Sequence, residues 1–321
     1  MHVTRPFTLL RAIALVAISA AAQAQDAWPS RPIHFVVPFG PGGANDLLAR
    51  AAAQGASKVL GQPIVVDNKG GAGAVLGTDI VAKAPHDGYT FLISAAGVVS
   101  NSMIRKVPYK DSDLVPVAMI GLAPSVVVVP ANSPYKDLND LVAASKTGQS
   151  LHFSTAGVGS TPHFVEGVLT TEYGAKLDLV PYKSGGESVA AVLGNQVEAT
   201  SEASIVVLPY LKSGRLKALA TTWTQRISAY PQLSTAVEQG FKNLQIAHWA
   251  GVHAPAGTPT DIQDKLAAAI DKAMKDPATV EKLRGLGIEP IGGDRASFIK
   301  FVNEERARLG AVVKATGMKD E

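Results

Sequence analysis

The chain has 321 residues with 30 Lys and Arg against 27 Asp and Glu, and it contains no cysteine, which excludes disulfides and thiol chemistry. Its formal net charge is only +3, and its sparse aromatic residues do not alternate with basic ones, so nothing predicts a nucleic-acid partner. A chain of this length exceeds what one hydrophobic core usually serves, and we therefore expect two lobes.

The first 24 residues have the pattern of a secretory signal peptide. Arg5 and Arg11 precede an apolar run that ends in the small-residue site Ala22-Gln-Ala24. This run is shorter than the roughly 20 apolar residues of a membrane-spanning helix, and no later run is long enough either. We therefore expect cleavage near Ala24, export to the periplasm and no insertion of the mature protein into the membrane.

Beyond this segment, short β-branched runs alternate with segments of helical period. Strands are expected at 33–37, 64–66, 89–94, 126–129, 151–155 and 216–221, and helices at 47–59, 258–275, 294–314 and, in a short piece, from residue 277. The alternation predicts an α/β fold with mostly parallel sheets flanked by helices. The run Val126–Val129 is apolar on both faces, which suits a sheet that is covered on both sides.

Two places in the chain have the same local order. Ile33-His-Phe leads into Phe39-Gly-Pro-Gly-Gly-Ala-Asn-Asp46, and Leu151-His-Phe leads into Ser154-Thr-Ala-Gly-Val-Gly-Ser-Thr161, each followed by a helix. Glycine brings bare backbone N–H groups close to a ligand, and a helix N-terminus adds partial positive charge. Either turn by itself could be an ordinary capped turn. Their matched positions favour a carboxylate or phosphate site with one turn from each lobe.

The C-terminal helices are expected to pack back on the first lobe. The chain would then cross between the lobes twice, near 122–125 and near 244–248. This predicts lobe 1 from residues 25–124 and 246–321, and lobe 2 from residues 125–245. Two crossings would form a hinge about which the lobes close.

Other site chemistries lack their sequence patterns. The glycines of 71–77 and 157–159 do not have the G-x-G-x-x-G spacing of a dinucleotide site, and no phosphate loop occurs. Neither a G-x-S-x-G elbow nor an H-E-x-x-H zinc pair is present. We therefore predict no catalytic residue, no metal and no cofactor.

Three titratable residues near the turns have alternative interpretations. His163 is expected to order the second turn, although an enzyme acting on a carboxylate would need it as a partner of Glu202. Asp46 is expected to cap the first helix. Glu202 reads as a cap too, but if it faces the cleft it would favour a ligand with an ammonium, hydroxyl or protonated group.

The order and spacing of several motifs from about Trp28 to the C-terminus resemble those of the tripartite tricarboxylate transporter receptors, also called Bug proteins. The motifs are Val37-Pro-Phe-Gly-Pro-Gly-Gly-Ala-Asn-Asp46 with Ala49-Arg50, Asn68-Lys-Gly-Gly-Ala-Gly73, Pro85-His-Asp-Gly-Tyr-Thr90, Ser154-Thr-Ala-Gly-Val-Gly-Ser160 with His163, Pro181-Tyr-Lys183, and Ala254-Pro-Ala-Gly-Thr-Pro259. Where we expect the family often to carry Asp-Asn, this chain has Glu202-Ala203. Its Phe39-Gly-Pro41 turn is also stiffer than the Ala-rich versions. The identity of the ligand therefore does not carry over.

The resemblance implies a type II periplasmic-binding-protein clamshell. Such a receptor is a monomer by default, is not an enzyme, and captures a small carboxylate, a dicarboxylate or an aromatic acid, for the membrane subunits of a tripartite transporter. A sensory module that hands the ligand to a membrane receptor remains the alternative. The ligand-binding positions implied or inferred are Phe39, Gly42, Gly43, Asn45, Asp46, Ser94, Ala95, Ala96, Ser154, Thr155, Gly159, Ser160, Thr161, His163, Tyr182, Ser201, Glu202 and Ala203.

Overall fold

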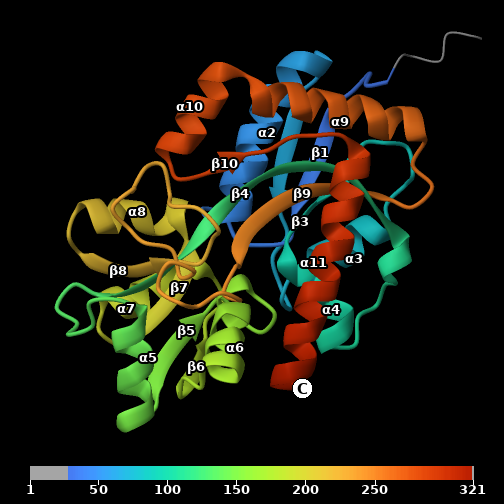
Figure 1. Ribbon diagram of the computed structural model, residues 1–321. Coiled ribbons are helices and arrows are strands. Elements are labelled where there is room, and N and C mark those ends of the chain that lie inside the picture. The colour runs from blue at the N-terminus through green and yellow to red at the C-terminus, as the bar shows by residue number, and fades with distance from the viewer. Residues whose placement is uncertain (1–27, 320–321) are drawn as a thin grey trace, which may run out of the picture.

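The computed structural model describes residues 28–319 and places them in α/β layers around one ten-stranded mixed sheet (Figure 1). The strands are β1 (Ile33–Val37), β2 (Ile64–Asn68), β3 (Thr90–Ser94), β4 (Leu114–Pro130), β5 (Leu151–Thr155), β6 (Leu177–Pro181), β7 (Ala199–Ala203), β8 (Leu216–Thr221), β9 (Ala247–Pro255) and β10 (Glu289–Pro290). The predicted signal peptide lies outside the described residues. Within 28–319, no helix is long and apolar enough to cross a bilayer.

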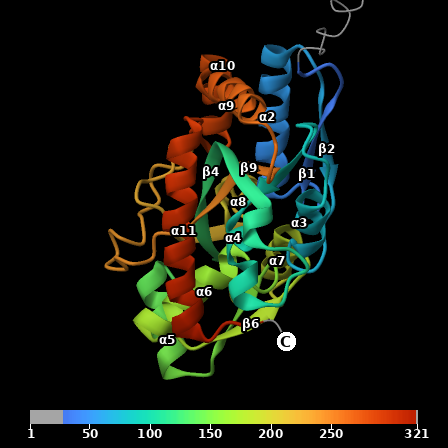
Figure 2. The ribbon, with the colours of Figure 1, turned by 90° about the vertical axis from the view of Figure 1, so that its right-hand side faces the viewer.

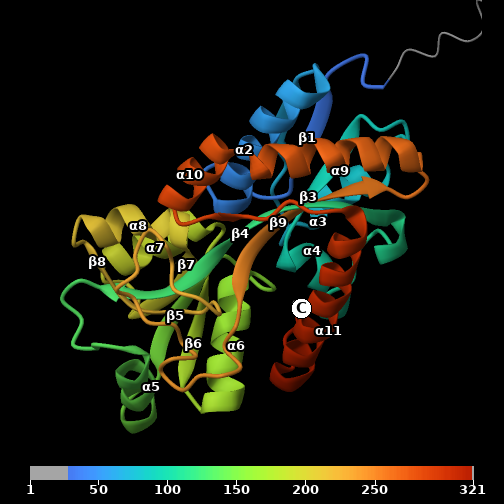
Figure 3. The ribbon, with the colours of Figure 1, turned by 45° about the horizontal axis from the view of Figure 1, so that its top comes forward.

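The helices cover both faces of the sheet. They are α2 (Ala44–Leu60), α3 (Val75–Ala82), α4 (Ala96–Ile104), α5 (Leu138–Thr147), α6 (Thr161–Tyr173), α7 (Gly185–Leu193), α8 (Ser204–Lys212), α9 (Thr260–Lys275), α10 (Pro277–Gly285) and α11 (Arg295–Thr316). Figure 3 shows α9 lying across the strands next to α2, and Figure 2 shows α11 running past α4 toward α6.

The strand order β2-β1-β3-β9-β4-β7-β5-β6 divides the sheet into two halves that share β4. In the first half β2, β1 and β3 are parallel, and in the second half β7, β5 and β6 are parallel. The central strands β9 and β4 run antiparallel to their neighbours. The predicted α/β fold is confirmed, and the antiparallel centre adds a feature that the sequence pattern did not indicate.

Alternation along β1 explains how the first half packs. Ile33, Phe35 and Val37 are fully buried against α2 and α9, while Val36 contributes to a separate cluster on the opposite face. A strand points successive side chains to opposite faces, so one run of apolar residues supplies both layers. This packing holds the C-terminal end of β1, and the turn that follows it, in place.

The run Val126–Val129 does the same for the second half. Val126 and Val128 pack in the cluster formed with α7 and α8, whereas Val127 and Val129 pack in the cluster that includes α5 and α6. All four side chains are fully buried. The expectation that this strand is covered on both faces is therefore met.

The two segments predicted to link the lobes lie side by side. Within the β4–β9 pair, Leu122 is opposite Trp249, Ala123 opposite His248, and Pro124 opposite Ala247. From Ser125 onward, β4 pairs with β7 and β8 instead. A single antiparallel ribbon thus joins the two halves of the sheet.

Candidate functional site

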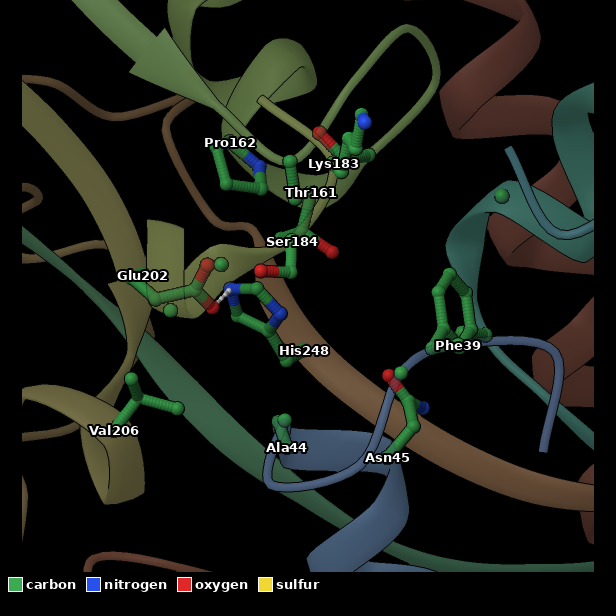
Figure 4. A pocket seen from close by; sticks show the side chains of 18 of the residues that line it. Phe39, Ala44, Asn45, Thr161, Pro162, Lys183, Ser184, Glu202, Val206 and His248 are labelled. Atoms are coloured by element: carbon green, nitrogen blue, oxygen red, sulfur yellow. Dashed lines mark ion pairs between the residues drawn. The ribbon is translucent and has the colours of Figure 1, made fainter. Parts of the chain in front are cut away.

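A cavity of about 190 Å³ lies where turns from both halves of the sheet meet (Figure 4). Its walls come from the turns after β1, β2, β3, β5 and β6 and the helix starts near them, together with residues of β7, α8 and β9. The residues that line it are Phe39, Gly40, Pro41, Gly42, Gly43, Ala44, Asn45, Gly73, Ala95, Gly97, Ala156, Val158, Gly159, Ser160, Thr161, Pro162, Lys183, Ser184, Gly185, Gly186, Glu202, Val206 and His248.

Four helices begin at this cavity. The N-cap residues of α2, α4, α6 and α7 are Gly43, Ala95, Ser160 and Ser184, and all four line it. Of these, only Ser184 accepts a capping hydrogen bond with its side chain, from the Glu187 N–H. The first N–H groups of a helix have no intrahelical acceptor and carry partial positive charge, so convergent N-termini suit an anion.

The first glycine-rich turn, residues 39–43, is hydrogen-bonded to Asp46, which does not line the cavity. Its carboxylate accepts the Gly42 N–H at 2.9 Å and the Asn68 side-chain amide at 3.0 Å, and it pairs with Arg50 at 2.9 Å. Burial works to raise the pKa of Asp46, but the bonds from Arg50, Gly42 and Asn68 outweigh it and lower that pKa below its usual value. Asp46 therefore supports the turn with an ionised carboxylate, while the N-cap itself is Gly43.

The second glycine-rich turn, residues 156–160, is held by His163. The Gly159 N–H donates to His163 Nδ1 at 3.3 Å, which requires a ring nitrogen without a proton. Burial, assisted by the charge of Arg105, lowers the pKa of His163 to about 4, so this ring is neutral at pH 7. The hydroxyl of Ser160 is buried at the cavity and has no hydrogen-bond partner among the described residues. The hydrogen-bonding capacity of this hydroxyl is therefore unused by the described residues.

Arg105, at the C-terminal end of α4, forms hydrogen bonds to the turn after β2 and to the turn after β5, which belong to different halves of the sheet. Its guanidinium donates to the Val158 carbonyl at 2.7 Å and to the Ala72 carbonyl at 3.0 Å. A Cβ added to Gly97 would meet the Gly159 carbonyl at 3.4 Å, so the start of α4 touches the second glycine-rich turn. The two walls of the cavity are thus in direct contact on this side.

A buried pair of a glutamate and a histidine lies on another side of the cavity. Glu202 Oε1, on β7, lies 3.2 Å from His248 Nε2, on β9, and the two side chains are 5% and 10% exposed (Figure 4). Glu202 Oε1 also accepts the Ala203 N–H at 2.8 Å. Burial lowers the pKa of His248, an effect that the charge of Glu202 partly opposes. The sequence left open whether Glu202 caps a helix or faces the cleft, and the structure places it in the cavity wall.

Residues 48–318 match the sequence model of the protein family described as the tripartite tricarboxylate transporter family receptor. The chain belongs to this family. BugT from Bordetella pertussis is 35% identical over 324 residues, which cover 99% of each chain. Rhodopseudomonas palustris Rpa4515, solved with adipate, has a TM-score of 0.86 and 31% identity over 91% of this chain and 99% of its own. MatC from the same organism, solved with bound malate, has a TM-score of 0.82 and 29% identity over 89% and 100%.

Half of the predicted ligand-binding positions line the cavity of this receptor. They are Phe39, Gly42, Gly43, Asn45, Ala95, Gly159, Ser160, Thr161 and Glu202. The side chain of Asn45 is also engaged elsewhere, since its amide donates to the Trp249 carbonyl at 2.8 Å. Asn45 therefore connects the first turn to the ribbon that joins the two halves.

The other predicted positions do not line it. They are Asp46, Ser94, Ala96, Ser154, Thr155, His163, Tyr182, Ser201 and Ala203. The serine hydroxyls among them are hydrogen-bonded within the protein. The Ser94 hydroxyl donates to the Gly251 carbonyl at 3.1 Å, Ser154 is hydrogen-bonded to Ser188 at 2.8 Å, and Ser201 is hydrogen-bonded to Ser125 at 2.6 Å. These hydroxyls join neighbouring elements of the receptor and so position the cavity walls.

Sequence reasoning missed the start of α7 and His248. The stretch Ser184-Gly-Gly-Glu187 has the S-x-x-E pattern of a helix start directly after a strand, and this signal could have identified it. His248 offered no such signal, because it alternates with apolar residues on β9 as any strand histidine could. Its place in the cavity depends on the pairing of β9 with β4.

Proposed function

We propose that this receptor captures a small carboxylate between two lobes in the periplasm and delivers it to the membrane subunits of a tripartite transporter. The observation that carries the proposal is the convergence of the N-termini of α2, α4 and α6, which have no side-chain cap, on one cavity, with the Ser160 hydroxyl unpartnered beside them. The relatives solved with adipate and with malate hold ligands of the same chemical class.

In this proposal, lobe 1 consists of residues 25–124 and 246–321, and lobe 2 consists of residues 125–245. Micromolar affinity corresponds to about −8 kcal/mol, and a hydrogen bond to a charged group contributes about 1.5–3 kcal/mol. One turn alone is therefore marginal once ordering costs are met, and both turns must contribute donors. The β4–β9 ribbon is the hinge about which a ligand shifts the population from open to closed.

The receptor returns its ligand unchanged and acts as a monomer in this proposal. The acid–base pair that an enzyme would need, His163 with Glu202, is not assembled in the described structure. His163 is bonded to the Gly159 N–H, and Glu202 lies beside His248. Neither arrangement pairs a base with a nucleophile.

A thermal-shift screen of the protein purified from the periplasm of an expressing bacterium tests the proposal. Aliphatic and aromatic mono-, di- and tricarboxylates and amino acids are added in turn, because a ligand that binds the native state raises the melting temperature. We expect a rise with one class of carboxylate, recovery of that acid unchanged, and a protein mass that lacks residues 1–24. No rise with any acid would overturn the proposal.

A further inference from the structure

The cavity has two chemically different ends. Helix N-termini without side-chain caps, those of α2, α4 and α6, form one end together with the Ser160 hydroxyl. Glu202 and His248 form the other, and both line the cavity while being more than nine-tenths buried. A carboxylate ligand fits the first end and is repelled by the second.

The pair at the second end has unused hydrogen-bonding capacity. Although His248 Nε2 is 3.2 Å from Glu202, the contact lacks hydrogen-bond geometry, and Nε2 has no hydrogen-bond partner among the described residues. Glu202 Oε2 lies so close to Gly185, the first residue of α7, that a Cβ there would collide with it. The Glu202 carboxylate therefore lies against the N-terminus of α7, and its Oε1 accepts the Ala203 N–H at 2.8 Å.

No cationic side chain among the cavity-lining residues pairs with Glu202, and the positive groups beside its carboxylate are the Ala203 N–H and the N-terminus of α7. Burial keeps His248 in its neutral form at pH 7, since it lowers the pKa of that ring. Lys183, the lysine of the lining, is exposed at the mouth, and its ammonium points away from Glu202 in Figure 4. A buried carboxylate without a cationic partner is costly, and a ligand cation would relieve that cost.

From this arrangement we infer that Glu202 and His248 select a ligand that carries an ammonium group in addition to its carboxylate. This inference rests on the proposed function and narrows it to the class of amino acids and related amine-bearing acids. The ligand carboxylate lies at the helix N-termini, and its ammonium donates to Glu202. A plain dicarboxylate of the same length places a second negative charge against Glu202 and binds more weakly.

Matched ligand pairs test the inference by isothermal titration calorimetry. Aspartate is compared with succinate, glutamate with glutarate, and 4-aminobutanoate with butanoate, since the members of each pair differ by the amine. We expect the amine-bearing member of the best-fitting pair to bind at least about tenfold tighter. In Glu202→Gln, which keeps the side-chain size, its affinity should fall about tenfold while that of the amine-free member holds or rises.

Glu198→Gln is the matched control. Glu198 forms a second Glu–His pair, with His152 at 3.1 Å, but that pair is exposed and does not line the cavity. This variant should leave both affinities unchanged. Equal or tighter binding of the amine-free acids by the wild type would overturn the inference and leave the carboxylate receptor standing, and so would a folded Glu202→Gln with unchanged preference. If Glu202→Gln does not fold, the inference is decided by the ratio of the wild-type affinities for the amine-bearing and the amine-free member of each pair. Absence of binding by every acid would instead refute the proposed function.

Discussion

Residues 39–43 are held by an ionised carboxylate, Asp46, whereas residues 156–160, at the same place in the other half of the sheet, are held by a neutral histidine, His163. Both side chains sit on the helix that follows the turn, and both accept a backbone N–H of the turn. Asp46 has Arg50 and Asn68 as further partners, while the second turn is tied across the cavity by Arg105. The same backbone motif can therefore be fixed by different charges, and the two turns should respond differently to mutation and to pH.

The largest loss of ligand affinity should come from a side chain that fills the cavity beside the first glycine-rich turn, residues 39–43. Gly43 has φ −79°, which any residue adopts, and an added Cβ would meet only the Gly40 carbonyl at 3.8 Å. Gly43→Val should therefore fold and abolish detectable binding of the carboxylate identified in the screen, because its side chain would occupy the cavity. Calorimetry measures the affinity.

Gly285→Val is the control for that prediction, because Gly285 has open space around it and does not line the cavity. Gly159 is a poorer position for the same test. It has φ +79°, which disfavours a side chain, and a Cβ there would lie 3.0 Å from Ile104. A folded Gly43→Val with wild-type affinity would contradict the assignment of the site.

Lowering the pH should affect the stability contributed by His163 and by Asp46 differently. The folded-state pKa of His163, about 4, lies below its usual 6.5, so the native state loses stability as the pH falls from 6.5 to 4, where the unfolded chain takes up a proton. His163→Gln removes this term and should reduce that loss by up to about 3 kcal/mol. Urea unfolding between pH 7 and 4 measures it.

Asp46→Asn provides the comparison in the same experiment. Because the pKa of Asp46 is lowered below its usual 3.8, the stability that it contributes is present above that pH and is lost only below it. The difference between this variant and the wild type should thus stay constant from pH 7 to 5. Identical pH dependences of His163→Gln and the wild type would show that His163 is not the titrating support.

A smaller effect should distinguish the two serine N-caps at the cavity. The Ser160 hydroxyl has no partner in the described structure, whereas the Ser184 hydroxyl accepts the Glu187 N–H at 3.2 Å. Ser160→Ala should weaken ligand binding about fivefold and leave the unliganded melting temperature unchanged. Ser184→Ala should cost about 1 kcal/mol of stability. A lower unliganded melting temperature in Ser160→Ala, with affinity unchanged, would mean that this hydroxyl supports the fold instead of the ligand.

Much of the architecture could be predicted because it depends on local patterns. The alternation in Ile33–Val37 and the double-sided burial of Val126–Val129 follow from the twofold period of strands. The glycine-rich turns before α2 and α6 were likewise found from composition alone. The order of motifs along the chain predicted the family, which the match over residues 48–318 confirms.

The cavity wall was predicted less well, because hydroxyl groups near a turn can serve the protein or a ligand. Ser154 and Ser160 flank the same turn and look equivalent in the sequence. In the structure, the Ser154 hydroxyl is hydrogen-bonded to Ser188, whereas Ser160 lines the cavity and its hydroxyl has no partner among the described residues. Which of them is satisfied depends on α7, which packs against β5 from a distant part of the chain.

The amino-acid sequence by itself determined the α/β class, the two glycine-rich turns and the family, since periodicity and turn composition act over a few residues. Only the tertiary structure decided that four helix N-termini share one cavity and that Glu202 on β7 meets His248 on β9 there. Those residues are far apart in the chain and are brought together by the pairing of β4 with both β7 and β9. The charge balance of the cavity, and with it the class of ligand that we infer, arises from that pairing.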